Sequence, residues 1–324
     1  MADDRSRAHE RLREELADDG VRLPGDGDPS CVDVVAILLH ELDLARRPPV
    51  FESRQAVFGT MVLTADASLV EGSDLVEVID LDMPLDQARR FAEGRSTFLV
   101  RRVDGGLQLA CFRRTIQYEA DLVEVQRATG AYIVQRTVMG TPRLVTDIGV
   151  IEWNGSRWRM RPSARAHLPA LRAAVPESDE AVLMGLLDLA AHWLSPSRIG
   201  ATFLLDLDPR PHDDHGQDHS ASLPSPSLSV TRRHHYPAIF AVIAQTDLAT
   251  LVSAHGEVTT LSVGLRSSIE SEAAVTMTNG MRHRSAARYT WDHDHIVAFV
   301  VSEDGPVTLF RHGEPIAVCA SDDC

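Results

Sequence analysis

Three short segments in the second half of the 324-residue chain combine residue types that can bind a phosphorylated ligand. Residues 246–249 stand at the entrance of an apolar run, 279–287 form a glycine turn that leads into a predicted helix, and 300–305 end another apolar run. Carboxylates, arginines and hydroxyl groups are side chains that hold phosphates and their metal ions. These segments point to a function only if the fold brings them together.

The segment 279–287 is the most informative of the three. A glycine turn followed by a helix N-terminus presents free backbone N–H groups and a partial positive charge. Arg282 and Arg284 add planar cationic groups, and His283 can donate a hydrogen bond to a phosphate. Cations are unfavourable at a helix N-terminus unless an anion sits there, so the pattern favours an anion site. A surface arginine cluster is the alternative interpretation.

The other two segments supply the remaining polar groups. Asp247 precedes a predicted buried strand, where a carboxylate can hold Mg²⁺ or Mn²⁺ against a nucleotide phosphate. Ser302 ends a strand at a tight turn and can contact a terminal phosphate. Taken singly, each also has a structural explanation, Asp247 as a strand-entry residue and Ser302 as the first residue of the turn.

These residues must be positioned by helices and strands, and the apolar pattern of the sequence predicts that these form a compact α/β domain over residues 179–318. Apolar residues at helical spacing predict a helix at 179–194, capped by Ser178, and the nearly continuous apolar run 199–207 predicts a buried strand. The further elements are a helix at 236–245, strands at 248–253 and 257–263, a helix near 283–290, and strands at 296–302 and 307–311.

The first half of the chain is predicted to be a separate strand-rich α/β domain over residues 51–162, in which no chemical motif is evident. Residues 1–50 form a helical segment, with helices at 5–18 and 31–45, and a further helix is expected at 84–93. Asn154-Gly155 indicates a β-hairpin, because both residues tolerate positive φ. The prolines in 163–178 suggest a linker, and 319–324 is expected to be a tail.

Composition and charge exclude several classes of protein. With 32 basic and 47 acidic residues the net charge is −15, which disfavours bulk nucleic-acid binding. No apolar run is long enough for a membrane span, and the charged N-terminus lacks the apolar core of a signal peptide, so a cytoplasmic protein is expected. The cysteines, Cys31, Cys111, Cys319 and Cys324, do not form a zinc-ribbon or disulfide pattern.

A histidine-rich stretch is a candidate metal site outside the three segments. His212, His215 and His219 lie in the Pro/His/Asp/Ser-rich residues 209–227. With no cysteine nearby and no helix beneath them, we expect an exposed loop there instead of a metal centre.

Together the three segments resemble the diadenylate cyclase (DAC) domain, the nucleotide-binding domain of the DNA-integrity-scanning protein and of the membrane-bound cyclases that make cyclic di-AMP. That family carries Asp-Gly-Ala on a strand, later Gly-Thr-Arg-His-Arg-Ala-Ala, and then Val-Val-Ser-Glu. Here DLATLVSAHGEV, GMRHRSAARYT and VVSEDGPVTLFRHGE stand in the same order, and LLDLAAHWLSPSRIGATFLLDL looks like the opening of the domain. The resemblance covers residues 179–318.

The resemblance implies a role for each matched residue. Asp247 would bind the catalytic Mg²⁺ or Mn²⁺, with His283 as a further metal ligand. Arg282, His283 and Arg284 would surround the ATP phosphates. The remaining nucleotide contacts would come from Leu248, Ala249, Gly280, Met281, Ser302 and Glu303.

In the family, two domains face each other with one ATP each, and each 3′-hydroxyl attacks the α-phosphate of the other ATP. The resemblance therefore implies a homodimer or a higher homo-oligomer, with the N-terminal half as a sensor or assembly module.

Two departures from the family motifs keep other functions open. Leu248 stands in place of the glycine of Asp-Gly-Ala, and Met281 in place of the threonine before Arg-His-Arg. The first hypothesis is an active cyclase, and the second is a catalytically degenerate domain that binds nucleotides as a sensor. The third is a two-domain interaction protein without a ligand.

Overall fold

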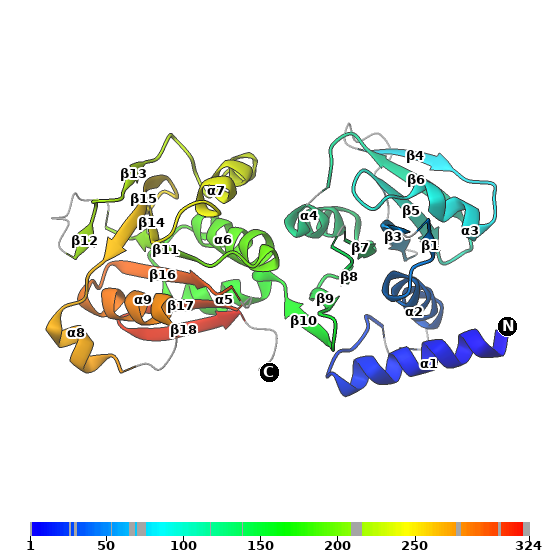
Figure 1. Ribbon diagram of the computed structural model, residues 1–324, viewed down its shortest axis with the longest axis horizontal. Helices are drawn as coiled ribbons and strands as arrows, with labels where there is room; N and C mark the ends of the chain where they lie inside the picture. Colours follow the sequence, from blue (N-terminus) through cyan, green and yellow to red (C-terminus); the bar gives the residue numbers. More distant parts are fainter. Residues whose placement is uncertain are drawn as a thin grey trace. The chain divides into compact units, whose positions relative to one another are not determined.

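The computed structural model describes the chain except residues 1, 26, 29–30, 53, 65–68, 70–75, 117, 138, 209–215, 277–279, 304–305 and 320–324. The predicted His212 and His215, the first residue of the segment 279–287, the turn 304–305 and Cys324 therefore lie outside the described residues. The chain divides into two compact units, Met1–Arg161 and Pro162–Asp323. Each contains a mixed sheet with helices, so the predicted α/β class is confirmed (Figure 1).

The first unit is built on an 8-stranded sheet of order β10-β9-β8-β7-β3-β5-β6-β4. Strands β3 and β5 run parallel, whereas β3 and β7, like β5 and β6, run antiparallel. Its elements are α1 (Ala2–Asp18), α2 (Val32–Arg46), β1 (Val50–Phe51), β2 (Arg54–Gln55), β3 (Phe58–Leu63), β4 (Val76–Asp80), α3 (Leu85–Ala88), β5 (Thr97–Arg102), β6 (Leu107–Phe112), α4 (Glu119–Thr129), β7 (Tyr132–Arg136), β8 (Pro142–Val145), β9 (Gly149–Trp153) and β10 (Trp158–Pro162).

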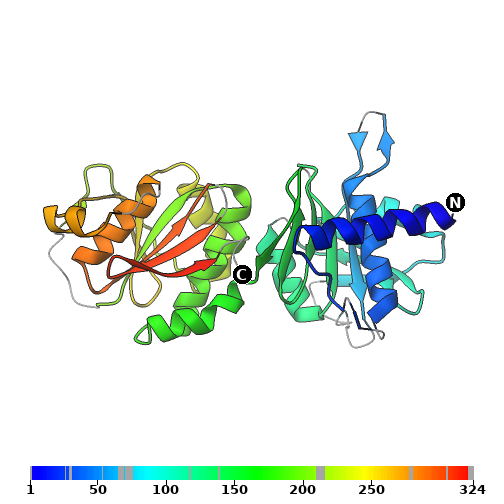
Figure 2. The ribbon, with the colours of Figure 1, turned by 90° about the horizontal axis from the view of Figure 1, so that it is seen from below.

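Helices α1 and α2 cover one face of this sheet (Figure 2). Leu38 and Leu42 of α2 are fully buried in one cluster with Val62 of β3 and Val134 of β7. Strand side chains alternate between the two faces, so Met61 points into a second cluster that includes residues of α4. The predicted helices at 5–18 and 31–45 are confirmed, but α4 has no counterpart in the prediction.

The predicted hairpin joins β9 and β10, which are neighbours in the sheet. Gly155 has φ +102°, and the Asn154 side-chain oxygen accepts hydrogen bonds from the backbone N–H groups of Ser156 and Arg157. The turn is therefore stabilised by the two residue types that predicted it.

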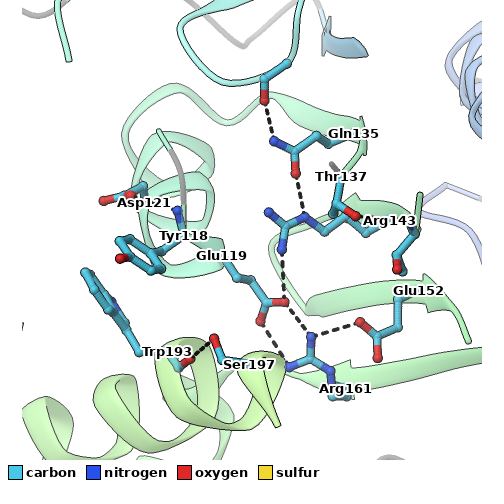
Figure 3. A network of polar contacts seen from close by, with 12 residues as sticks. Tyr118, Glu119, Asp121, Gln135, Thr137, Arg143, Glu152, Arg161, Trp193 and Ser197 are labelled. Atoms are coloured by element: carbon cyan, nitrogen blue, oxygen red, sulfur yellow. Dashed lines mark hydrogen bonds and ion pairs between the residues drawn. The ribbon is translucent and has the colours of Figure 1, made fainter. Parts of the chain in front are cut away.

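A buried charge network ties α4 to β8, β9 and β10 (Figure 3). Glu119, whose side chain is fully buried, accepts a hydrogen bond of 3.0 Å from Arg161 and lies 3.6 Å from Arg143. Arg161 also donates to Glu152 at 3.3 Å, and Arg143 donates to Gln135 at 2.7 Å. Each buried charge thus has partners of opposite charge, which burial requires.

The second unit is built on another 8-stranded sheet of order β12-β15-β14-β11-β16-β17-β18, with β13 also paired to β15. Strand β11 runs parallel to β14 and antiparallel to β16. The elements are α5 (Ala164–Ala174), α6 (Glu180–Leu189), β11 (Ala201–Asp206), β12 (Gln217–Asp218), β13 (Leu223–Pro224), α7 (Tyr236–Ile243), β14 (Ala249–Val252), β15 (Val258–Leu265), α8 (Ile269–Ala274), α9 (Met281–Asp292), β16 (Ile296–Val301), β17 (Val307–Arg311) and β18 (Glu314–Cys319).

Helix α9 packs along β16 and β17 (Figure 1). Its buried Ala286 and Tyr289 share a cluster with Ala298 and Val300 of β16. Phe299, the alternate residue of β16, points to the opposite face and is also fully buried. Both faces of the central strands are therefore covered, as their continuous apolar sequences predict.

The segment 163–178 differs from its prediction as a linker, because it contains α5. Pro169 lies inside that helix and removes a backbone donor, so the prolines alone favour a break. Leu168 and Leu171 are nevertheless buried, and this packing outweighs the local preference. The cap of α6 is Asp179, which accepts a hydrogen bond from the Ala181 backbone N–H, and not the predicted Ser178.

Two further differences concern short elements. The described part of the predicted loop 209–227 contains the two-residue strands β12 and β13, which pair with β15. Helix α8 and strand β18 were not predicted, and β18 takes in Cys319 from the expected tail. None of the helices in the described ranges combines the length and apolar character needed to cross a membrane.

Candidate functional site

The register of the second sheet brings two of the predicted segments to one edge. Ala201 lies opposite Val301 in the antiparallel pair β11–β16, and Thr202 lies opposite Ala249 in the parallel pair β11–β14. The start of β14 and the end of β16 therefore flank the start of β11. The residues just before β14 and just after β16 must meet there.

Arg282, the second residue of α9, joins these two segments. Its guanidinium donates to the Asp247 carboxylate at 3.2 Å and to the Glu303 carboxylate at 2.9 Å. The backbone N–H of Leu248 and then Arg282 lower the pKa of Asp247 below its usual value, so this carboxylate is ionised at neutral pH. The acidic strand entrance and the basic helix start thus converge as the sequence predicts.

Gly200, immediately before β11, makes room for this arrangement. A Cβ atom at that position would overlap the guanidinium of Arg282 and would lie 3.1 Å from Cγ of Glu303. The missing side chain therefore lets Arg282 lie across the sheet edge between its two carboxylates. Gly200 was not predicted as a site residue, because a single glycine before a strand has no specific meaning in the sequence.

A cavity of about 600 Å³ opens over this edge. All of the predicted site residues except Arg284 line it: Asp247, Leu248, Ala249, Gly280, Met281, Arg282, His283, Ser302 and Glu303. Its volume lies within the range of small-molecule sites, about 300–1,000 Å³. The described wall also includes residues that the sequence did not single out: Thr202, Val263, Gly264, Leu265, Ser285 and Val301.

Arg284 is exposed and is not among the residues that line this cavity. Residues two apart on a helix face different sides, since each position turns the side chain by about 100°. Arg282 and Arg284 therefore leave α9 on different sides. Of the three residues Arg-His-Arg, only the first two line this cavity.

The N-terminus of α9 forms one wall. Gly280 is its N-cap, and a Cβ atom there would meet nothing within 4 Å. The Arg284 N–H donates to the Gly280 carbonyl oxygen at 3.2 Å and closes the first turn, so the N–H groups before it have no acceptor within the helix. This end can accept an anion.

Two apolar side chains stand at the cavity where the related motifs have glycine and threonine. Met281 is 76% exposed and Leu248 is 50% exposed. Leu248 has φ +73°, a left-handed conformation that favours glycine. The backbone therefore keeps the conformation of a glycine motif although the side chain is bulky, which costs about 1–2 kcal/mol.

His283 lies deeper in the wall. Its Nε2 is 3.3 Å from the Thr308 hydroxyl, and its ring stands edge-on to Phe310 at 5.9 Å between centroids. Burial lowers the pKa of His283 below its usual value, so the ring is neutral at neutral pH. Its role at the site is therefore that of a neutral hydrogen-bonding group and not of a cation.

The third predicted segment holds its place through the hairpin that follows β16. The Ser302 N–H donates to the Pro306 carbonyl oxygen at 2.9 Å, which closes the turn toward β17. The Ser302 side chain is half-buried and lines the cavity. Ser302 is therefore the first residue of the turn, as its structural explanation expects. It also lines the cavity, where its hydroxyl can contact a ligand.

The donor set fits a divalent cation that is delivered with a phosphate ligand. Mg²⁺ is usually held by one or two carboxylates together with substrate phosphates and water. Asp247 and Glu303 are ionisable, largely exposed and share one arginine. Within the described ranges no cluster of three or more His, Cys, Asp or Glu side chains could hold a metal by itself.

Comparison with known protein families assigns both halves of the chain. Residues 10–161 match the family described as probable sensor domain DACNK. Residues 189–315 match the family described as DisA bacterial checkpoint controller nucleotide-binding, within the span 179–318 of the sequence resemblance. None of the curated proteins matches the chain.

Two solved structures are similar to part of the chain. A double mutant of DacA from Staphylococcus aureus is 17% identical with a TM-score of 0.34, over 44% of this chain and 88% of that chain. A hypothetical membrane spanning protein from Bacillus cereus is 16% identical with a TM-score of 0.30, over 49% of this chain and 80% of that chain.

Proposed function

Because the chain carries an N-terminal DACNK probable sensor domain and a C-terminal DAC domain of the DisA nucleotide-binding family, we propose that it condenses two ATP molecules into cyclic di-AMP. The observation that supports this most strongly is the convergence of Asp247, Arg282 and Glu303 at one cavity with the open N-terminus of α9. An anionic ligand and a cation can be held there side by side.

The proposed reaction needs two copies of the domain that face each other. The 3′-hydroxyl oxygen of each ATP forms a bond to the α-phosphorus of the other ATP and releases its proton to water. The bond between that phosphorus and the oxygen bridging to the β-phosphate breaks, and pyrophosphate leaves. Positioning and charge neutralisation supply most of the acceleration in such transfers. We therefore expect a homodimer or a higher homo-oligomer.

The chain's own residues divide this work. The first-turn N–H groups of α9 and the Arg282 guanidinium bind phosphate oxygens, and Ser302 donates to a further one. Neutral His283 orients a phosphate oxygen by a hydrogen bond. Arg284, which does not line this cavity, is available to a nucleotide held by the facing copy.

Asp247 would hold Mg²⁺ or Mn²⁺, with His283 as a further candidate ligand. A bound divalent cation neutralises phosphate charge and orients the transferred group. In this family context the metal is expected to enter with ATP, since the protein side contributes only part of a coordination shell.

Asp247→Asn tests the proposal. The purified chain, incubated with ATP and Mg²⁺ or Mn²⁺, is expected to yield cyclic di-AMP by chromatography and mass spectrometry, and the variant should lose the product. Asp294→Asn makes the same chemical change at a side chain that is 88% exposed and outside the cavity, so it should retain activity. A wild-type chain that forms no product with either metal, or an Asp247→Asn variant as active as the control, would refute an active cyclase centred on this residue.

A second candidate function is a nucleotide-binding regulator without turnover. It is favoured by the Leu248 side chain, which projects into the cavity from a strained backbone. Calorimetry with ATP and with cyclic di-AMP separates the two functions. Binding of either nucleotide with no product supports the regulator, and product formation by Leu248→Gly alone would identify Leu248 as the cause of the lost activity.

A further inference from the structure

A buried cluster in the first unit carries more positive than negative charge. Glu41 is fully buried, and one of its carboxylate oxygens accepts hydrogen bonds of 2.5 Å from both Arg89 and Arg101. Its other oxygen accepts from the Thr60 hydroxyl at 3.0 Å. One carboxylate thus faces two guanidinium groups, and the local sum is one positive charge among side chains that are at most 16% exposed. Burial makes such an excess unfavourable unless an anion neutralises it.

His40 extends the cluster with a hydrogen-bond donor. Its Nδ1 lies 3.3 Å from Arg101 and 3.5 Å from Arg89. Both neighbours only donate, so Nδ1 must accept and the proton of the neutral ring sits on Nε2. Burial first, and then the cation of Arg89, lower the pKa of His40 to about 4, which keeps the ring neutral. Among the described residues nothing accepts a hydrogen bond from Nε2.

A cavity of about 340 Å³ opens beside this cluster. Its polar wall is formed by His9, His40, Arg101 and Arg102, and its apolar wall by Ala36, Ile37, Val103 and Leu107. Asp33 is the acidic residue among the described lining residues, but it is exposed and stands in the first turn of α2, where a carboxylate favours the helix dipole. The interior of the cavity is therefore cationic and donor-rich, with room for a small molecule.

We propose that this cavity in the first unit binds a small anionic metabolite, a carboxylate or a phosphate, through Arg101 and the His40 Nε2–H. The guanidinium supplies the charge that the buried cluster leaves unbalanced, and His40 fixes the direction of approach. The apolar wall accommodates a short carbon skeleton. A polymer such as nucleic acid is excluded by the volume, and a cation by the charge.

This site is independent of the proposed cyclase chemistry. It would give the DACNK domain a ligand of defined charge and size. Arg102 contributes less, because it is already paired with Asp104 at 3.3 Å on the surface. The test therefore substitutes Arg101 and His40.

Isothermal titration calorimetry on the full chain tests the proposal with two probes, inorganic phosphate and succinate. Phosphate is also expected in the nucleotide cavity, so every chain carries Arg282→Ala. In that background Arg101→Met and His40→Phe remove the cation and the donor. Arg114→Met is the matched control, since it removes the same charge from an exposed pair with Glu124, 2.9 Å apart, outside the cavity.

We expect saturable binding of at least one probe, one per chain, and a loss of about tenfold or more in affinity with either cavity variant, as removal of a charge-assisted hydrogen bond implies. The control should bind as the parent does. Binding of phosphate alone or of succinate alone would assign the chemical class. Glu41 keeps Arg89 as a partner when Arg101 is replaced, and circular dichroism checks the fold. If Arg101→Met does not fold, His40→Phe decides.

No heat from either probe in the parent, or binding that survives both variants, overturns the proposal. Because all of these chains lack Arg282 and the readout is binding in the first unit, such a failure leaves the outcome with Asp247→Asn unaffected. The two proposals can therefore fail separately.

Discussion

Leu248 offers a sharp test of how the nucleotide cavity is built. Its φ of +73° places a bulky residue in a conformation where glycine is favoured. We compare Leu248→Gly with Leu248→Ala, because both remove the side chain beyond Cβ and lose the same packing. The difference between their free energies of unfolding then reports only the conformational preference of the backbone at position 248.

The magnitude follows from two opposing terms. In an ordinary strand conformation, alanine is more stable than glycine by about 0.5–1 kcal/mol, because glycine loses more entropy on folding. In the left-handed region a Cβ atom costs about 1–2 kcal/mol. At position 248 the second term outweighs the first, and Leu248→Gly should be the more stable variant, by about 0.8 kcal/mol.

Leu223 provides the matched control. It is a leucine of similar exposure, 46%, in strand β13 with an ordinary backbone conformation. There the alanine variant should be the more stable one. Subtracting the glycine-to-alanine difference at 223 from that at 248 should leave about 1–2 kcal/mol, the cost of the left-handed conformation itself.

Denaturant-dependent hydrogen exchange, read by mass spectrometry on peptides of β11 and β16, measures the free energy of unfolding of the second unit in the full chain. If the alanine variant were more stable than the glycine variant at both positions, position 248 would not be held in the left-handed region. The interpretation of Leu248 as a residue in a glycine position would then be wrong.

Three more perturbations follow from the structure. Gly200→Ala should weaken ATP binding, measured by calorimetry, with little loss of stability, because its methyl group displaces the flexible end of Arg282; unchanged affinity would contradict this. Glu119→Gln should destabilise the chain by about 3–5 kcal/mol in urea unfolding, because it removes the buried negative charge that Arg143 and Arg161 share, whereas the exposed Glu124→Gln should cost less than about 1 kcal/mol. His40 has a pKa of about 4 in the folded chain against 6.5 ordinarily, so its contribution to stability is complete above pH 6.5 and is lost as the pH falls toward 4. His40→Phe should therefore flatten the plot of unfolding free energy against pH between pH 6.5 and about 4. An unchanged slope would show that His40 does not have this lowered pKa.

The elements with strong local signals were predictable from the sequence. Asn154-Gly155 fixed a hairpin because few other residues adopt positive φ, and the continuous apolar run of β11 indicated a strand covered on both faces. Helix α5 was missed because Pro169 is unfavourable in a helix interior, and only the burial of Leu168 and Leu171 compensates for it. Such compensation depends on contacts that are remote in sequence.

The cavity at the edge of the second sheet was also largely predictable, since most of the residues that line it come from motifs in a known order. The predicted helix began only near residue 283, so it did not place Arg282 and Arg284 on different sides of one helix, and the sequence could not show that Gly200 makes room for the guanidinium. The cluster around Glu41 gave no signal at all. Its members lie far apart along the chain, and only the sheet brings Arg101 beside α2.

Arg282 lies between Asp247 and Glu303, so the three side chains together carry one negative charge in excess at the cavity. In the proposed cyclase, a triphosphate would compete with the two carboxylates for this arginine, and a divalent cation at Asp247 would weaken the ion pair between Asp247 and Arg282. Metal and nucleotide would then each make the binding of the other more favourable. By thermodynamic linkage, the factor by which the cation tightens nucleotide affinity must equal the factor by which nucleotide tightens cation affinity.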